Sequence, residues 1–139
     1  MNDDFSTCLL LNARMAARTL TRLADGKLRP YGITGAQFNI LASLLVHADR
    51  SVTELATRLA MERSTLSRNL DLLEKKGLVS ERVSARANFR ACRLTEAGLA
   101  LIEKLRPEWR QFQTELKASL DAPDFETSLT ALRQLAQVQ

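Results

Sequence analysis

Apolar residues recur at helical spacing along almost all of this 139-residue chain and alternate only between residues 79 and 94. Recurrence at every third or fourth position buries one face of a helix, whereas alternation buries one face of a strand. Val79, Glu81 and Val83 form one alternating set, and a second short strand fits residues 89–94. The pattern therefore predicts a mainly α fold with a small β-hairpin.

Six helical segments surround this hairpin. The first, from about Ser6 to Lys27, is apolar over most of its circumference, which predicts burial on more sides than a small monomer provides. Thr34 and Ser51, each followed three residues later by Gln or Glu, predict capping boxes at the starts of the next two helices. A long helix from residue 95 contains Pro107, which is expected to kink it. After a break at residues 121–124, a last helix has an apolar stripe that is expected to point inward, formed by Phe125, Leu129, Leu132 and Leu135.

The most informative segment lies around the break at residues 60–62, where a short helix is followed by a helix over residues 63–76. Leu66, Leu70 and Leu73 point inward in the second of these, opposite a polar face that includes Ser64 and Arg68. This is the helix-turn-helix layout, in which the second helix enters the major groove of DNA. Helix pairs with this spacing also arise as plain packing, so the neighbouring charge decides between the two interpretations.

Positive charge gathers in the same part of the chain. Residues 51–93 carry nine basic and five acidic side chains, whereas residues 94–139 carry five basic and seven acidic ones. Four of the basic residues, Arg82, Arg86, Arg90 and Arg93, lie on the predicted hairpin. A basic hairpin directly after a helix-turn-helix makes a winged helix, whose tip can reach phosphate or the minor groove. DNA binding is therefore favoured over a solvated basic face.

Composition excludes several other classes. The chain is 45% hydrophobic and 26% charged, as folded domains are, and no apolar run approaches the roughly 20 residues that cross a bilayer. Its N-terminus reads Met-Asn-Asp-Asp, acidic where a signal peptide is basic, which predicts a cytoplasmic protein. One histidine and two separated cysteines offer little for a metal site, a disulfide framework or a catalytic triad. We therefore expect no enzyme, no cofactor and no membrane partner.

Several segments together resemble the MarR family of bacterial transcription regulators. They read LRPYGIT at residues 28–34, LAMERSTLSRNL at 59–70, LEKKGLV at 73–79 and LTEAG at 94–98. The resemblance implies one domain over residues 1–139, with dimerisation helices at about 5–30 and 96–138, a winged helix-turn-helix at about 34–94 and its wing at about 79–94. It also implies a homodimeric repressor that binds a pseudo-palindromic operator in double-stranded DNA and is released by a small-molecule effector.

The resemblance also assigns site residues. Arg68 is the expected base reader, because a guanidinium pairs bidentately with guanine. The wing departs from the family pattern, since the usual Asp-x-Arg reads Arg86-Ala87-Asn88 here, and either Arg86 or Arg90 is expected in the minor groove. The predicted DNA-binding residues are Arg63, Ser64, Thr65, Ser67, Arg68, Asn69, Lys75, Lys76, Arg82, Arg86 and Arg90, with Lys75, Lys76 and Arg82 on phosphates. The predicted dimerisation residues are Leu9, Ala13, Ala16, Leu20, Leu23, Leu129, Leu132 and Leu135.

Two alternatives remain open. Some relatives sense peroxides through a cysteine in the first helix, which suggests a redox role for Cys8, but alignment puts the sensing position at Leu10. A neutral cysteine on an apolar helix face is usually a small core residue, and packing is favoured for both Cys8 and Cys92. The other alternative is a winged-helix module that binds a protein partner and no DNA, which the missing acidic residue in the wing supports.

Overall fold

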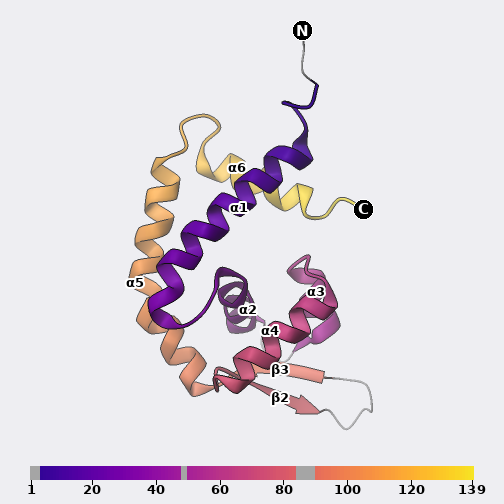
Figure 1. Cartoon of the computed structure of the whole chain (residues 1–139), viewed down its shortest axis with the longest axis vertical. Coiled ribbons are helices and arrows are strands. Elements are labelled where there is room, and N and C mark those ends of the chain that lie inside the picture. The colour runs from indigo at the N-terminus through magenta and orange to yellow at the C-terminus, as the bar shows by residue number, and fades with distance from the viewer. Residues whose placement is uncertain (1–3, 48–49, 84–89) are drawn as a thin grey trace.

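The computed structural model describes residues 4–47, 50–83 and 90–139. It confirms the predicted class, because a small antiparallel sheet is attached to a set of helices (Figure 1). The helices are α1 (Leu9–Leu28), the 3-10 helix η1 (Arg29–Tyr31), α2 (Gly35–Val46), α3 (Val52–Arg58), α4 (Arg63–Lys75), α5 (Glu96–Ala118) and α6 (Phe125–Leu135). The strands are β1 (Arg50–Ser51), β2 (Val79–Val83) and β3 (Arg90–Leu94). Over these ranges, the helices are too short or too polar to cross a membrane.

The winged helix-turn-helix has its own hydrophobic core. The three α4 leucines that the sequence predicts to point inward, Leu66, Leu70 and Leu73, are at most 2% exposed. They join a cluster of buried side chains from the end of α1, from α2 and α3, from the sheet and from α5 as far as Phe112. This unit therefore buries its own apolar residues without help from a second chain.

Local signals place the helix ends as the sequence predicts. At Thr34 both bonds of the capping box are present, since its hydroxyl accepts from the Gln37 backbone N–H and the Gln37 side chain accepts from the Thr34 backbone N–H. The Ser51 hydroxyl likewise accepts from the Glu54 backbone N–H. Between α3 and α4 the chain turns at Ala60, whose φ is 50°, so the predicted break is confirmed.

The sheet contains one strand that the sequence pattern missed. Its order is β1-β3-β2 and both pairings are antiparallel, with Arg50 opposite Cys92 and Glu81 also opposite Cys92 from the other side. β1 is two residues long, too short to show alternation. It anchors the start of α3 to the hairpin.

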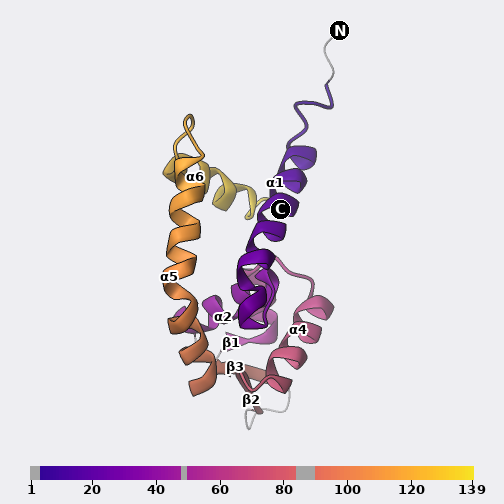
Figure 2. The ribbon, with the colours of Figure 1, turned by 60° about the vertical axis from the view of Figure 1, so that its left-hand side comes forward.

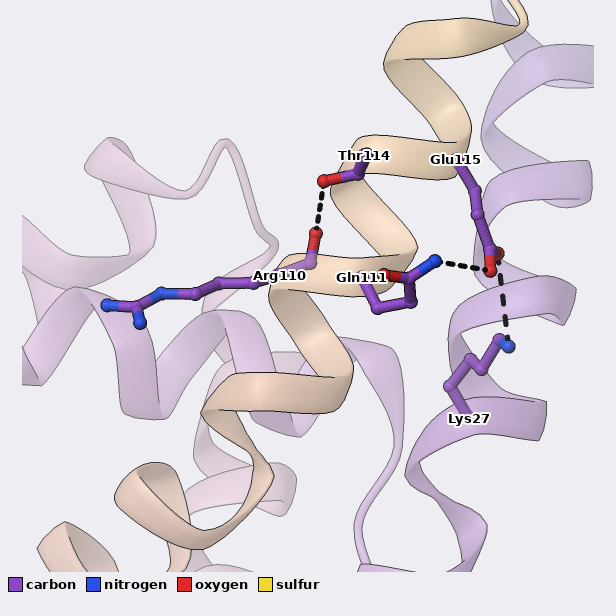
Figure 3. Close-up of polar contacts among 5 residues, drawn as sticks. All are labelled: Lys27, Arg110, Gln111, Thr114 and Glu115. Carbon is purple, nitrogen blue, oxygen red and sulfur yellow. Dashed lines mark hydrogen bonds and ion pairs between the residues drawn. The ribbon is translucent and has the colours of Figure 1, made fainter.

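Helices α1, α5 and α6 form an arm; α5 starts beside the sheet, and α6 lies at the end of the arm away from the hairpin (Figure 1, Figure 2). α1 begins at Leu9, three residues after the predicted Ser6, because Cys8 is its N-cap. α5 runs without interruption through Pro107 and curves along its length (Figure 1). The ammonium of Lys27 in α1 lies 4.0 Å from the Glu115 carboxylate of α5. This ion pair, drawn as a dashed line in Figure 3, links the two long helices.

The structure corrects one expectation for α6. The apolar stripe of α6 was predicted to point inward, but α6 has no buried residue within a single chain. Leu132 is 53% exposed and Leu135 is 43% exposed, while Leu9 of α1 is 67% exposed. The arm therefore presents apolar surface that one chain does not cover.

Candidate nucleic-acid interface

The outward face of α4 is polar and accessible. Ser64, Arg68, Asp71 and Lys75 are exposed along it, whereas Thr65 and Ser67 are half-buried at its margin. The helix packs its other face on α2, α3 and β2 (Figure 1). A helix held in this way can enter a major groove without rearrangement of the core.

Arg68 is at the centre of this face. Its guanidinium donates to the Thr65 hydroxyl over 3.5 Å, at the limit for a hydrogen bond. In the described part of the chain, no carboxylate forms an ion pair with it. Its donors therefore remain available for the bidentate contact to guanine that the sequence predicts.

The start of α4 offers a second kind of contact. Its N-cap is Glu62, whose side chain makes no capping hydrogen bond, and Arg63 is exposed in the first turn. Backbone N–H groups in the first turn of a helix lack partners within the helix and attract anions. This end, with Arg63, is suited to a DNA phosphate.

Two of the predicted DNA-binding residues make side-chain contacts with distant parts of the chain. The Asn69 amide donates to the Thr65 carbonyl over 3.0 Å and accepts from the amide of buried Gln37 of α2 over 3.5 Å. The ammonium of Lys76 donates to the backbone carbonyl of Gly32, in the turn between α1 and α2. Its neighbour Lys75 stays exposed. Sequence periodicity gave no sign of these contacts, since both partners lie far away in the chain.

The hairpin follows α4 directly. Arg82 pairs in register with Ala91, and Arg90 pairs with Val83, so both arginines lie on the strands close to the connecting loop. Arg86 lies outside the described residues. Cys92, on β3, is fully buried, which confirms its predicted packing role.

The arm has an apolar groove of about 550 Å³ between α1, α5 and α6. It is bordered by five of the predicted dimerisation residues, namely Ala16, Leu20, Leu23, Leu129 and Leu132. The other three, Leu9, Ala13 and Leu135, are exposed outside it. A separate hollow of about 310 Å³ lies between α1, α2 and α5, with Trp109 and Phe112 among its lining residues.

Trp109 is positioned by its aromatic neighbours. Its ring centroid lies 4.1 Å from that of Phe38 in α2 and 5.3 Å from that of Phe112 in α5. Contacts at these distances stabilise aromatic side chains beyond simple burial. Trp109 thus joins the winged helix to the arm, as a core residue rather than a free surface group.

Comparison with known proteins agrees with this geometry. Residues 31–87 match the family model described as MarR family. The structure is similar to the transcriptional regulator MosR of M. tuberculosis in complex with DNA, with 36% identity, 94% of each chain covered and a TM-score of 0.84. It is also similar to a mutant of E. coli MarR complexed with operator DNA, with 28% identity, 96% of this chain and 99% of that chain covered, and a TM-score of 0.81.

A curated relative has a less extensive match. The chain is 33% identical over 95 residues to YdgJ of Bacillus subtilis, described as an uncharacterized HTH-type transcriptional regulator. The aligned part covers 67% of this chain and 57% of that protein. The match therefore spans little more than half the length of this curated relative.

Proposed function

This chain belongs to the MarR family of transcriptional regulators, and we propose that it acts as a homodimer that binds a pseudo-palindromic operator in double-stranded DNA. The observation that carries the proposal is the exposed face of α4, where Arg68 has no acidic partner among the described residues. The basic hairpin lies directly beside this helix. The solved structures of MosR and MarR with DNA support the same use of the fold.

The arm supports the homodimer. Apolar residues of α1 and α6 are exposed in one chain, and the groove between α1, α5 and α6 is lined mostly by apolar side chains. A second copy would cover these surfaces and bring two α4 helices to half-sites roughly 34 Å apart, one turn of DNA. Symmetric pairing of this kind explains why the operator is expected to be pseudo-palindromic.

Repression with release by a small molecule is the finer part of the proposal. The hollow beside Trp109 lies between the arm and the winged helix, where a ligand would change how the two parts meet. Tilting the arm would alter the distance between the two recognition helices and hence the affinity for an operator of fixed spacing.

The test is selection of bound duplexes from random fragments, followed by mobility-shift titration at about 50 and 200 mM salt. We expect one enriched pseudo-palindrome whose affinity falls by a factor of roughly 10³ or more across this range, because phosphate contacts release counterions. Enrichment of no sequence, or affinity that does not depend on salt, would contradict the proposal. Either result would favour a winged helix that binds a protein partner.

A further inference from the structure

Side-chain hydrogen bonds between distant parts of the chain gather at the turn formed by η1 and Gly32. The Tyr31 hydroxyl donates to a Glu108 carboxylate oxygen of α5 over 2.8 Å, across 77 positions of sequence. The Lys76 ammonium, just past the end of α4, donates to the Gly32 carbonyl across 44 positions. Two neighbouring residues of one turn thus contact both the arm and the recognition helix.

The turn is built so that it does not deform easily. Pro30 fixes its own φ, and Gly32 adopts a φ of 74°, which a glycine reaches without strain. The Gly32 backbone N–H donates to the Arg29 carbonyl over 3.0 Å. On its far side, the Asp25 carboxylate accepts from the Gly35 backbone N–H over 2.7 Å. With a turn held in this way, a displacement of Glu108 would be passed on to Lys76.

The end of α4 is also held by the beginning of α5. The Thr95 hydroxyl donates to the Gly77 carbonyl over 2.6 Å, and the Thr95 backbone N–H donates to the Leu78 carbonyl over 3.1 Å. Gly98 approaches so closely that a Cβ there would lie 2.2 Å from the Leu78 carbonyl oxygen. α5 thus contacts the C-terminal end of α4 in two ways. Thr95 contacts it directly, and Glu108 does so through the turn at Tyr31 and Gly32.

Besides its buried leucines and the contacts of Thr95, α4 has two further supports. One is the contact of Asn69 with Gln37, and the other is the contact of Lys76 with Gly32. They are seven residues apart, which is about 10 Å along a helix axis. Loss of the second support would leave the C-terminal end of α4 freer to swing about the first.

We infer that Tyr31, Glu108 and Lys76 are positioning residues that fix the angle between the α5 arm and the recognition helix, and thereby the half-site spacing that the dimer accepts. The inference rests on the proposed DNA binding. It assigns Lys76 a role different from the phosphate contact expected from the sequence. Because α5 belongs to the arm that would join two subunits, an angle fixed here becomes a fixed distance between the two α4 helices.

The experiment measures affinity for a single half-site and for paired half-sites whose spacing is varied in steps of one base pair. In Tyr31→Phe and Lys76→Met, we expect the preference for the best spacing over its neighbours to fall about 2- to 10-fold, the value of one hydrogen bond. Affinity for the single half-site should change less than about 2-fold. Glu108→Gln keeps an acceptor for the Tyr31 hydroxyl and should retain the wild-type spacing preference.

Lys104→Met is the matched control, because Lys104 is exposed on α5 and makes no hydrogen bond or ion pair with the described residues. It removes the same charge as Lys76→Met and should leave the spacing profile unchanged. The double variant of Tyr31→Phe and Lys76→Met should lose no more than the larger single loss, since both contacts act through one turn.

Three results would overturn the inference. An unchanged spacing profile in Tyr31→Phe would show that the turn does not couple the position of α5 to that of α4. An equal loss at every spacing and at the single half-site in Lys76→Met would make Lys76 a phosphate contact. If the losses of spacing preference added up in the double variant, the contacts of Tyr31 and Lys76 would act independently and not through one turn.

Amide hydrogen exchange of the free protein separates this inference from the proposed function. Tyr31→Phe should speed exchange in the last turn of α4 and at Gly77, while Lys104→Met should not. If the wild-type protein binds no specific DNA, the proposed function fails. Independently of DNA binding, unchanged amide exchange in Tyr31→Phe would refute the coupling of α5 to α4 through the turn.

Discussion

Leucine side chains are buried within one chain in the winged helix but exposed in the arm. The inward leucines of α4 are almost completely inaccessible within one chain, whereas Leu9, Leu20 and Leu23 of α1 are between 41% and 67% exposed. Both sets recur at helical spacing, so the periodicity of the sequence is the same. The winged helix therefore buries its apolar residues within one chain, whereas the arm presents an apolar surface that a second copy would cover.

This contrast has a thermodynamic consequence. Burial within the chain contributes to folding at any protein concentration, whereas burial between chains contributes only as far as association proceeds. Substitutions in the two regions should therefore differ in their dependence on concentration.

The core should be the more sensitive region to truncation. Leu66→Ala leaves a cavity in a fully buried site and should lower the free energy of unfolding by about 2–5 kcal/mol. Leu72, on the same helix, is 46% exposed, so Leu72→Ala should cost under about 1 kcal/mol. Denaturant titration of both variants at one protein concentration checks this. Similar losses would show that the core of the winged helix is not closed as described.

The arm should respond to charge through association. Leu132→Glu places a carboxylate on the apolar face of α6 and should raise the dissociation constant of the dimer by about 100-fold or more. Arg133→Gln changes the net charge equally at an exposed neighbouring position and serves as its control. Sedimentation velocity over a range of concentrations measures both. If the Leu132→Glu dimer had the same dissociation constant as the wild type, α6 would not be part of the dimer interface.

The exposed face of α4 should divide into base and phosphate contacts. Arg68→Ala should cost about 1–3 kcal/mol per half-site on the operator and relax the base preference there. Lys75→Ala should weaken binding to all sequences alike, because phosphates carry no base identity. Competition titrations with operator and scrambled duplexes separate the two cases. Equal losses on both duplexes for Arg68→Ala would withdraw its assignment as a base reader.

The wing should contribute less than α4. Arg86→Ala or Arg90→Ala should reduce the slope of log affinity against log salt by about one unit and leave the preferred major-groove bases unchanged. The expected contribution is modest because the wing has no aspartate at residue 86 to orient its arginine. If neither variant alters affinity or its salt slope, the wing does not touch DNA.

The smallest expected effect is a change in the pKa of Tyr31. The carboxylate of Glu108 accepts the Tyr31 hydroxyl and raises the pKa of that tyrosine, since hydrogen bonding, desolvation and the nearby negative charge all favour the neutral phenol. This contact stabilises the fold below the unfolded tyrosine pKa near 10, and its contribution is lost as pH rises through the folded value. Tyr31 is the single tyrosine of the chain, so tyrosinate absorbance reports it alone. The midpoint should fall in Glu108→Ala, which removes both the acceptor and the charge, and an unchanged midpoint would show that the contact is absent in solution.

Local signals explain how much of this structure could be predicted. The capping box at Thr34, the break near Ala60 and the hairpin depend on neighbouring residues, and the sequence predicted all three. Strand β1 was missed because its two residues are ordered by pairing with β3, some 40 positions later. The contacts of Asn69 and Lys76 were missed for the same reason, since their partners Gln37 and Gly32 become neighbours only on folding.

The exposed leucines mark a different limit of prediction. An apolar stripe shows that a helix face will be covered, but it does not identify what covers it. In α4 the cover comes from the same chain, and in α6 it does not. Periodicity alone does not separate the two cases, because the distinction depends on which helices of one chain meet; the dimerisation role predicted for the α6 leucines came from the family resemblance.

Two copies are expected to join through their arms and to present two complete DNA-reading units. Sedimentation equilibrium at micromolar concentration, without and with a duplex carrying two half-sites, tests it most directly. We predict a particle of twice the 15.5 kDa of one chain before DNA is added, and two chains on each duplex afterwards. A particle of 15.5 kDa that stays monomeric at this concentration and binds the duplex one chain at a time would contradict the account.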